Sequence, residues 1–493
     1  MTRTPCKKIY YKVELLLESP LTIGSGRDIA TDQDIIKNRN GEPYIPATAL
    51  TGIYRTLFEE EKAKQYFGYV KIEGEVKEEK NLQKETEMVL QKDRNEFTRK
   101  SKNSEIIVYD GSLLGEFYLS QRDGVTLDEW KTAKKGSKFN FEILETNAHF
   151  ITFLEITEKV PKGEENGKSE LKTVVEQILR FLRSGTIHLG ARTTRGYGKV
   201  KAEHIWKAEF DFSKTEEVMK RWLDFNLYAN TSEWNEITEE ITKEITNFSQ
   251  KSFLRISLKL KQKSGIFIRK YATDKKMEVP EEQKMEKSDL SKEIQVGSEQ
   301  LTLHDTNRSP VIPGSSWAGA FRHHLKRLMK EGDIYESQLI EQWFGIVNKK
   351  KKISKKSLIV FHETVLRGTK EKTITRNAID RFSGAVVDGA LFKEKFCIDG
   401  HGNLEILIRK EKESILKQKE TIFFQLLSAT IMDLHNGILA IGGVTASGRG
   451  LFEVESITIG KAEAFMIEGD SSYQKVYQIL QEEWKKILVD SEG

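Results

Sequence analysis

The sequence predicts an α+β fold built from two similar units in tandem. The chain has 493 residues, which is enough for two or three domains of ordinary size. The same local motifs occur twice in the same order, which indicates an internal duplication. Within each set of motifs, strand-like alternation and helix-like periodicity follow the same order. Each copy is therefore expected to fold around its own core.

The duplication is clearest around two Ile-Pro pairs. In the first copy, a glycine lies six residues and an arginine nine residues after Pro46. In the second copy, Gly319 and Arg322 lie at the same distances after Pro313. The later matches are Phe67-Gly68 with Phe344-Gly345, the β-branched runs 106–109 and 358–361, and the glycine-rich turns 185–200 and 437–452. Four matches in one order are not expected by chance.

Periodicity predicts the elements of each unit. Alternating, β-branched residues predict strands at Lys8–Glu18 and Phe253–Lys261. Hydroxyl residues after the Ile-Pro pairs, Thr48 in one copy and Ser315 and Ser316 in the other, are expected to be helix N-caps. The helices are expected at 48–61, 171–184, 315–329 and 420–435. Strand, helix, strands, helix and strand is the order of a ferredoxin-like unit.

This order divides the chain into four parts. We expect a first domain at 1–205, a helical linker at 206–250, a second domain at 251–460 and a helical tail at 461–493. Trp222 and Trp234 in the linker are spaced as on an amphipathic helix, which is expected to pack against one domain or to dock a partner. The charge-dense insertions 59–104 and 274–299 lack an apolar stripe, so they are expected to project as loops or hairpins.

Composition excludes several classes of protein. Two cysteines, Cys6 and Cys397, cannot build a disulfide framework or a multi-cysteine zinc site. No apolar run approaches the ~20 residues of a membrane helix, and the start of the chain has no signal-peptide core, so a soluble cytoplasmic protein is expected. The 79 basic and 75 acidic residues give a net charge of only +4. Any case for a nucleic-acid partner must therefore come from the local placement of cations.

The glycine-rich turns are candidate phosphate-binding segments. Glycine lets backbone amides approach an anion closely, and Arg192, Arg195 and Lys199 add positive charge to the first turn, as Arg449 does to the second. The alternative is a tight turn beside a helix, with no ligand. The glycines expected at the RNA are Gly190, Gly196, Gly198, Gly442, Gly443 and Gly448.

These motifs together resemble a known family. Leu21-Thr-Ile-Gly-Ser-Gly26, Ile45-Pro-Ala-Thr-Ala-Leu-Thr-Gly52 with Arg55, and Gly190-Ala-Arg-Thr-Thr-Arg-Gly-Tyr-Gly198 are similar to motifs of the RAMP superfamily. More narrowly, they resemble the backbone subunits of type III CRISPR effector complexes. The second copy repeats the helix motif at 313–319, and 376–392 is similar to that family's thumb segment. The resemblance spans about 8–200 and 253–455, and two copies in one chain look like the fused subunits of some type III-D complexes.

The resemblance implies two ferredoxin-like, RRM-related RAMP domains with inserted thumb hairpins and loops. It further implies that each copy binds the backbone of a guide RNA (crRNA), that the thumb disrupts pairing with a single-stranded target RNA, and that other effector subunits are partners. The guanidinium group of arginine can donate two parallel hydrogen bonds to phosphate oxygens, while base pairing supplies sequence specificity. The side chains expected to contact RNA are Lys37, Arg55, Arg192, Arg195, Lys199, Arg322, Arg376, Arg381 and Arg449.

Where this family cuts target RNA, the resemblance implies one aspartate, placed five residues before a lysine. Asp32, before Lys37, matches that position, with Asp34 and Asp28 as neighbouring alternatives. One carboxylate can accept the proton of the attacking 2′-hydroxyl or hold a hydrated Mg²⁺ or Mn²⁺ against the phosphate. The alternative is that Asp32 only caps a turn.

The second copy departs from the family pattern at the candidate acid. Glu299 stands opposite Asp32 when both are counted from the Ile-Pro pair, and Asp274 and Asp305 flank that region. Glutamate is one methylene longer, and small misplacements of a reacting group cost large factors in rate. We therefore expect the first copy to cut and the second chiefly to bind.

Two other functions stay open. One is a catalytically silent RNA-binding scaffold, and the other is an endonuclease that processes guide precursors. The nine histidines show no metal-ligand spacing. His323 and His324 are expected at the surface or facing RNA, and His188 as a packed residue.

Overall fold

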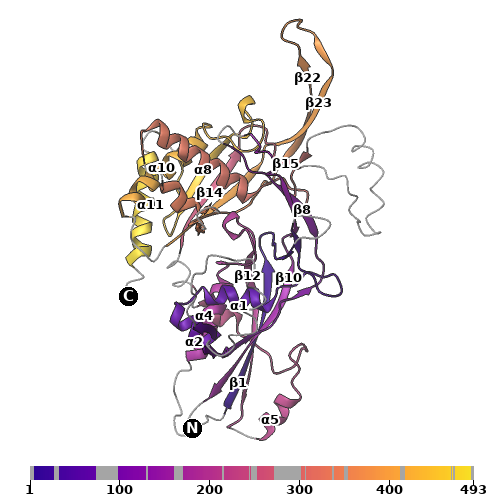
Figure 1. Cartoon of the computed structure of the whole chain (residues 1–493), viewed down its shortest axis with the longest axis vertical. Coiled ribbons are helices and arrows are strands. Elements are labelled where there is room, and N and C mark those ends of the chain that lie inside the picture. The colour runs from indigo at the N-terminus through magenta and orange to yellow at the C-terminus, as the bar shows by residue number, and fades with distance from the viewer. Residues whose placement is uncertain are drawn as a thin grey trace, which may run out of the picture.

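The computed structural model describes residues 5–26, 33–73, 98–128, 132–159, 170–213, 216–243, 245, 253–270, 301–305, 307–335, 338–348, 353–410, 417–467, 469 and 472–489. Two units, each with its own sheet and core, lie one above the other in Figure 1, and a long hairpin projects from the upper, C-terminal unit. This arrangement confirms the predicted tandem α+β fold.

The first unit is built on a sheet whose central strand is β1 (Pro5–Leu17). It pairs antiparallel with β10 (His149–Lys159) on one side and β12 (Lys199–Asp211) on the other. The strand order is β11 (Ile187–His188), β12, β1, β10 and β6 (Ile106–Val108), while β7 (Ser112–Leu114) and β13 (Asn235–Glu236) pair with β10 and β12. Alternate residues of β1, such as Val13 and Leu15, are fully buried, as the alternating sequence predicted.

Helices supply the other half of this core. They are α1 (Ala47–Arg55), α2 (Glu60–Phe67) and α4 (Glu170–Arg183). Val175, Ile178 and Leu179 of α4 are fully buried, and the helix contacts β10 and β12. A second, smaller aromatic cluster joins Tyr10 and Phe210 of the sheet to residues that follow β12.

The second unit repeats this plan. Its sheet has the order β20 (Ile359–Phe361), β24 (His401–Arg409), β14 (Phe253–Gln262) and β25 (Phe452–Ile459). Its helices are α8 (Gly314–Glu331), α9 (Leu339–Phe344), α10 (Lys417–His435) and α11 (Ser472–Val489). Trp317, Phe321 and Trp343 are core residues, as predicted, and the Trp343 ring stacks on Phe423 at 3.8 Å.

Each unit carries a hairpin next to its glycine-rich turn. We call β8 (Leu119–Gly124) with β9 (Phe139–Leu144) the first hairpin, and β22 (Lys370–Ile379) with β23 (Val386–Ile398) the second hairpin. The second hairpin, in orange, projects far beyond the body of the protein in Figure 1. Its sequence includes the predicted thumb segment 376–392. Its tip exposes Phe382 completely.

Short pairs complete the structure. They are β4 (Tyr69–Glu73) with β5 (Thr98–Lys102), β17 (Val311–Ile312) with β21 (Thr364–Val365), and β18 (Ile346–Asn348) with β19 (Ile353–Lys355). The expectation that the insertion 59–104 projects as loops or hairpins was wrong for its first part, because α2 packs Tyr66 and Phe67 into the core. The β4–β5 hairpin also lies inside this insertion, whose residues 74–97 lie outside the described part of the chain. The insertion predicted at 274–299 lies outside it entirely.

Two predictions about the helices after the Ile-Pro pairs were wrong. The helix expected at 48–61 is two helices, because the Thr56 hydroxyl bonds back to the Ile53 carbonyl and the chain turns before α2. The N-caps of α1 and α8 are Pro46 and Pro313, so Thr48, Ser315 and Ser316 lie inside the first helical turns. The orphan amide of Ala47 instead donates to Asp110 Oδ1 at 2.6 Å, a partner from a distant loop.

The predicted linker also differs from its description as a helix. Residues 206–211 continue β12, and only α5 (Glu216–Leu223) and α6 (Thr238–Lys243) are helical. Trp222 lies on α5 but Trp234 lies in a loop, where its ring packs 5.3 Å from Phe225. The expectation that this segment packs against one domain is confirmed, because its aromatic residues join the Tyr10 cluster of the first unit.

Candidate nucleic-acid interface

The first glycine-rich turn lies at the junction of the two units. Its short 3-10 helix η1 (Thr193–Arg195) contacts β20 and α8 of the second unit. A Cβ atom built on Gly314 would lie 2.1 Å from the Phe361 carbonyl oxygen and 2.3 Å from that of Arg195. A Cβ on Gly196 would lie 2.6 Å from the same Phe361 oxygen. Only glycine fits at these two positions, so the units meet backbone to backbone.

Three arginines converge at this junction, and we call them the arginine cluster: Arg192, Arg195 and Arg322. Arg192 adopts a left-handed conformation (φ 59°), and its guanidinium lies 3.8 Å from the centre of the Phe141 ring of the first hairpin. Burial lowers the pKa of Arg195, and the positive charges of Arg322 and Arg192 lower it further. Within the described residues, neither Arg195 nor Arg322 forms an ion pair with a carboxylate. Partly buried like charges are unfavourable unless an anion joins them, so this cluster suits a phosphate.

A buried polar network lies beside the arginine cluster. Arg122 of the first hairpin lies 3.4 Å from Glu145 and 3.7 Å from Glu363 of the second unit. The rings of His188 and His362, one from each unit, are 5.1 Å apart. Burial raises the pKa of Glu363 to about 7 against the opposing effect of Arg122. Sequence reasoning missed this network apart from His188, which was correctly expected to be packed, because its members come from different halves of the chain.

The buried histidines and the buried glutamate of this network are expected to change the stability of the protein in opposite directions when the pH changes. Burial lowers the pKa values of His188 and His362 to about 3, so the stability that they contribute is present above pH 6.5 and is lost as the pH falls. Glu363 has a raised pKa, so its contribution is lost as the pH rises towards 7. We expect the two effects largely to cancel in the wild type between pH 7.5 and 5.5.

Single substitutions should separate these effects. When the pH is lowered from 7.5 to 5.5, the free energy of unfolding of His362→Phe is expected to rise by about 1 kcal/mol relative to that of the wild type. That of Glu363→Gln is expected to fall by a similar amount relative to the wild type. Urea unfolding midpoints at the two pH values measure both shifts. The exposed His204, which pairs with Glu236, provides the control variant His204→Phe. Parallel responses of His362→Phe and the wild type would contradict the assignment.

Several cations predicted to contact RNA are engaged within the protein. Lys199 lies 3.1 Å from Glu18 and 3.6 Å from Glu405 of the second unit. Lys37 pairs with Glu142 at 2.9 Å. Arg55 donates to the carbonyl oxygen of Gly68 at 2.7 Å, which closes the end of α2. These side chains position the loops around the interface.

The glycines of both turns serve close backbone packing. A Cβ on Gly198 would lie 1.9 Å from the Leu189 oxygen, and one on Gly190 would lie 2.3 Å from the Thr22 oxygen. In the second turn, around η4 (Thr445–Ser447), a Cβ on Gly442 would lie 2.7 Å from the Phe267 oxygen, and one on Gly443 would lie 3.1 Å from the Phe267 ring. Gly448, by contrast, has nothing within 4 Å of such an atom. The alternative of a tight turn therefore accounts for most of these glycines.

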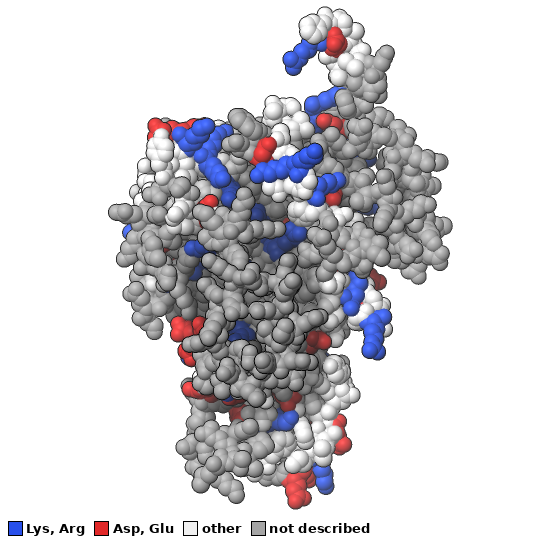
Figure 2. Space-filling model, viewed as in Figure 1, with Lys and Arg blue, Asp and Glu red and all other residues white. Residues whose placement is uncertain are grey.

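The second glycine-rich turn holds the base of the second hairpin. Arg449 is buried, lies 2.9 Å from Glu394 and stacks over the Phe396 ring at 3.9 Å. Arg376 lies 3.7 Å from the same carboxylate. Arg381 is exposed near the hairpin tip. Figure 2 shows Lys and Arg side chains gathered over the upper unit and along the base of this hairpin.

The candidate acid loop is fixed at both ends. Residues 27–32, which include Asp28 and Asp32, lie outside the described part of the chain, and β2 (Gly24–Gly26) and β3 (Asp34–Ile35) bracket them as a pair. Glu142 of the first hairpin accepts the amide of Ile35 at 3.1 Å and the ammonium of Lys37. The loop therefore starts and ends at the base of the first hairpin. Asp34 is only 9% exposed, which leaves its side chain poorly placed for a substrate.

The second unit brackets its candidate loop in the same way. β15 (Arg269–Lys270) pairs with β16 (Leu301–Thr302), while Asp274 and Glu299 lie outside the described residues. Asp305 Oδ1 accepts the amides of Asn307 and Ser309, as Asn38 Oδ1 accepts those of Asn40 and Glu42 in the first unit. Asp305 therefore forms a turn.

Within the described residues, two groups of side chains could hold a metal ion: His304, Glu371 and Cys397, and Glu14, His149 and Glu203. Both groups lie outside the acid loop. Mg²⁺ is commonly held by one or two carboxylates together with substrate phosphates. Asp32 with an RNA phosphate would meet that minimum.

One histidine prediction was wrong. His324 is buried, and its Nε2 lies 2.5 Å from Asp433 of α10, because the α8 helix presents it to the core.

Comparison with known proteins agrees with this structure. A family model described as the RAMP superfamily matches residues 14–201 and 259–453. The chain belongs to the RAMP superfamily. The two matched segments coincide with the two sheets, so the chain is a tandem double RAMP protein. A comparison with curated proteins finds no relative that matches it.

Membership indicates a CRISPR-associated, RNA-binding protein that acts within a complex of several subunits. Across the part of this RAMP chain that the structure describes, no helix has the length and apolar character needed to cross a membrane.

Proposed function

We propose that this RAMP protein is a fused double backbone subunit of a type III CRISPR effector complex, most similar to type III-D. Each unit binds part of the guide RNA (crRNA), and the first unit cleaves the paired single-stranded target RNA with Mg²⁺ or Mn²⁺. The observation that carries the proposal is the arginine cluster, in which side chains from both units converge and Arg195 and Arg322 form no ion pair with a carboxylate among the described residues. Other effector subunits complete the complex.

The cluster supports backbone binding. Arg195 and Arg322 belong to different units, so a phosphate held between them would lie at the junction, and a strand that crosses it would contact both units. Guanidinium forks bind phosphate oxygens without base specificity. The proposed guide therefore runs across the two units and leaves its bases free to pair.

The positions of the two hairpins support cleavage in the first unit. Both candidate acid loops begin and end beside a hairpin base, since Glu142 of the first hairpin anchors the Asp32 loop and β16 contacts β23. A hairpin that displaces one target nucleotide would leave its 2′-hydroxyl free to attack the adjacent phosphate. The new bond from the 2′-oxygen to phosphorus would replace the bond to the 5′-oxygen of the next nucleotide, which leaves a 2′,3′-cyclic phosphate and a protonated 5′-hydroxyl. In this proposal Asp32 accepts that proton or orients the bound cation, which would neutralise charge on the phosphate. The second unit, with Glu299 instead, chiefly binds.

RNA binding by the arginine cluster can be measured directly. Arg195→Ala and Arg322→Ala are each expected to weaken single-stranded RNA binding about tenfold near ~0.1 M salt. Each should also make the slope of log K against log salt less negative by about 0.7. Fluorescence anisotropy across a salt series measures both quantities.

A matched control lies on the same helix. Arg327 of α8 pairs with Glu331 at 3.5 Å, so Arg327→Ala should change affinity little. The RNA-free Arg195→Ala protein is expected to melt at the same temperature or higher, because like-charge repulsion is removed. Unchanged affinity and salt slope in both cluster variants would contradict the proposed interface.

A further inference from the structure

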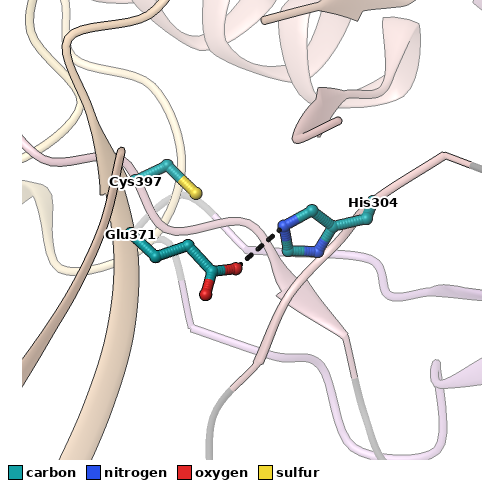
Figure 3. A group of neighbouring side chains, drawn as sticks. All are labelled: His304, Glu371 and Cys397. Atoms are coloured by element: carbon teal, nitrogen blue, oxygen red, sulfur yellow. Dashed lines mark ion pairs between the residues drawn. The ribbon is translucent and has the colours of Figure 1, made fainter. Parts of the chain in front are cut away.

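A group of side chains at the base of the second hairpin has the chemistry of a metal site. His304, Glu371 and Cys397 each offer one ligand atom, and these atoms all lie within 4.8 Å of one another. Figure 3 shows Glu371 and Cys397 on the hairpin side and His304 facing them from a neighbouring segment. Imidazole nitrogen, thiolate sulfur and carboxylate oxygen are the ligands that Zn²⁺ uses in proteins.

We propose that His304, Glu371 and Cys397 bind one Zn²⁺-type cation, which ties the base of the second hairpin to the segment 303–305. This site is separate from the acid loop of the first unit, and its donor set differs from that of Mg²⁺, which prefers oxygen ligands. The inference goes beyond the proposed RNA function and does not depend on it.

The backbone places the three ligands in advance. Glu371 and Cys397 are directly opposite each other in the β22–β23 register, so their side chains share one face. Cys397 exchanges both backbone hydrogen bonds with Ile266. The segment before His304 is held by the bond from the Leu303 amide to the Ile268 oxygen, at 2.9 Å.

Distances and exposure also fit zinc. His304 Nε2 lies 3.5 Å from Glu371 Oε1. Two ligands of a tetrahedral zinc are about 3.3–3.8 Å apart at bond lengths of about 2.0–2.3 Å, so small side-chain movements would complete the site. Cys397 is buried and Glu371 is exposed, so one side opens to solvent. That opening gives an entry path and room for a water as fourth ligand.

The first unit provides an internal comparison. Lys37 lies nine residues before Pro46, as His304 lies nine before Pro313. Lys37 forms an ordinary ion pair with Glu142. The strand position that matches Cys397 is Leu144, which bridges to Leu21 as Cys397 bridges to Ile266. At both positions the second unit therefore has metal-ligating residues where the first has a lysine and a leucine.

Cobalt titration tests the site without RNA. Protein stripped with a chelator and kept reduced is titrated with Co²⁺, which gives a thiolate-to-cobalt charge-transfer absorption when a cysteine binds it. We expect one equivalent to bind with this absorption, Zn²⁺ to abolish the absorption, and excess Mg²⁺ to leave it unchanged. Cys397→Ser should remove the absorption, and His304→Gln should weaken binding at least tenfold.

Controls separate the site from other donors. Cys6→Ser should keep the signal, and so should His149→Gln, which alters the second candidate group at Glu14, His149 and Glu203. Circular dichroism melts of the metal-free variants check folding, and Zn²⁺ should raise the melting temperature of the wild type but not of Cys397→Ser. No thiolate absorption at micromolar Co²⁺, or an unchanged one in Cys397→Ser, would overturn the proposal.

Discussion

Replacing Asp32 with alanine is expected to abolish cleavage of target RNA while leaving target binding intact. The assembled complex, with guide and matched target, should lose about 10²–10⁴-fold in cleavage rate, the range for a residue that accepts or delivers a proton. The physical reason is the loss of the carboxylate that would accept the proton or orient the cation. The described residues that flank it, Gly26 and Asp34, are paired, and Glu142 accepts the amide of Ile35 beside them. Single-turnover cleavage and a filter-binding isotherm, recorded on the same preparation, separate chemistry from binding.

Further experiments test the role of the second candidate acid and distinguish the proposed function from its alternatives. Glu299→Ala is the matched variant in the second unit and should leave most cleavage intact. Equal cutting by Asp32→Ala and the wild type would move the chemistry to another residue. Absence of cutting by the wild type would favour a silent scaffold, and cutting of guide precursors by the isolated chain would favour a processing endonuclease.

Gly314→Ala is expected to destabilise the junction between the units by about 2–4 kcal/mol. Its Cβ would lie 2.1 Å and 2.3 Å from two backbone oxygens, of Phe361 and Arg195, and neither can move without shifting β20 or η1. Alanine favours a helix more than glycine does, so any loss reports the steric clash. Guanidinium chloride unfolding monitored by tryptophan fluorescence measures the change.

The same helix contains the control for this experiment. A Cβ added at Gly319, five residues further along α8, would have nothing within 4 Å, so Gly319→Ala should stabilise the protein by about 0.5–1 kcal/mol. Because Arg195 moves with its carbonyl, Gly314→Ala should also weaken RNA binding. Equal stabilities of Gly314→Ala and the wild type would show that the two units are not packed through this contact.

The comparison of the two units explains why much of the fold could be predicted. The strands beginning near Lys8 and at Phe253, and the helices before each glycine-rich turn, follow from the period of their own apolar residues. Caps and breaks were less predictable because their partners are remote. Asp110 caps α1 from another loop, and the Arg55 side chain closes α2.

The candidate site likewise combines features that the local sequence predicts with features that depend on remote partners. Arg195 and Arg322 were recognised individually as phosphate donors, whereas Lys199 and Lys37 were assigned to RNA although they pair with carboxylates. Whether a cation is available depends on its neighbours in space. A sequence position does not contain that information.

By itself, the sequence determined the duplication, the order of strands and helices in each copy, and the motifs that the RAMP family model matches, because local periodicity and spacing encode them. Only the tertiary structure decided that Gly196 and Gly314 join the units, that the charge of Arg322 lies close enough to lower the pKa of Arg195, and that His304, Glu371 and Cys397 lie side by side. These groupings bring together residues far apart along the chain, and packing of one unit on the other, or of a hairpin on its domain, creates them.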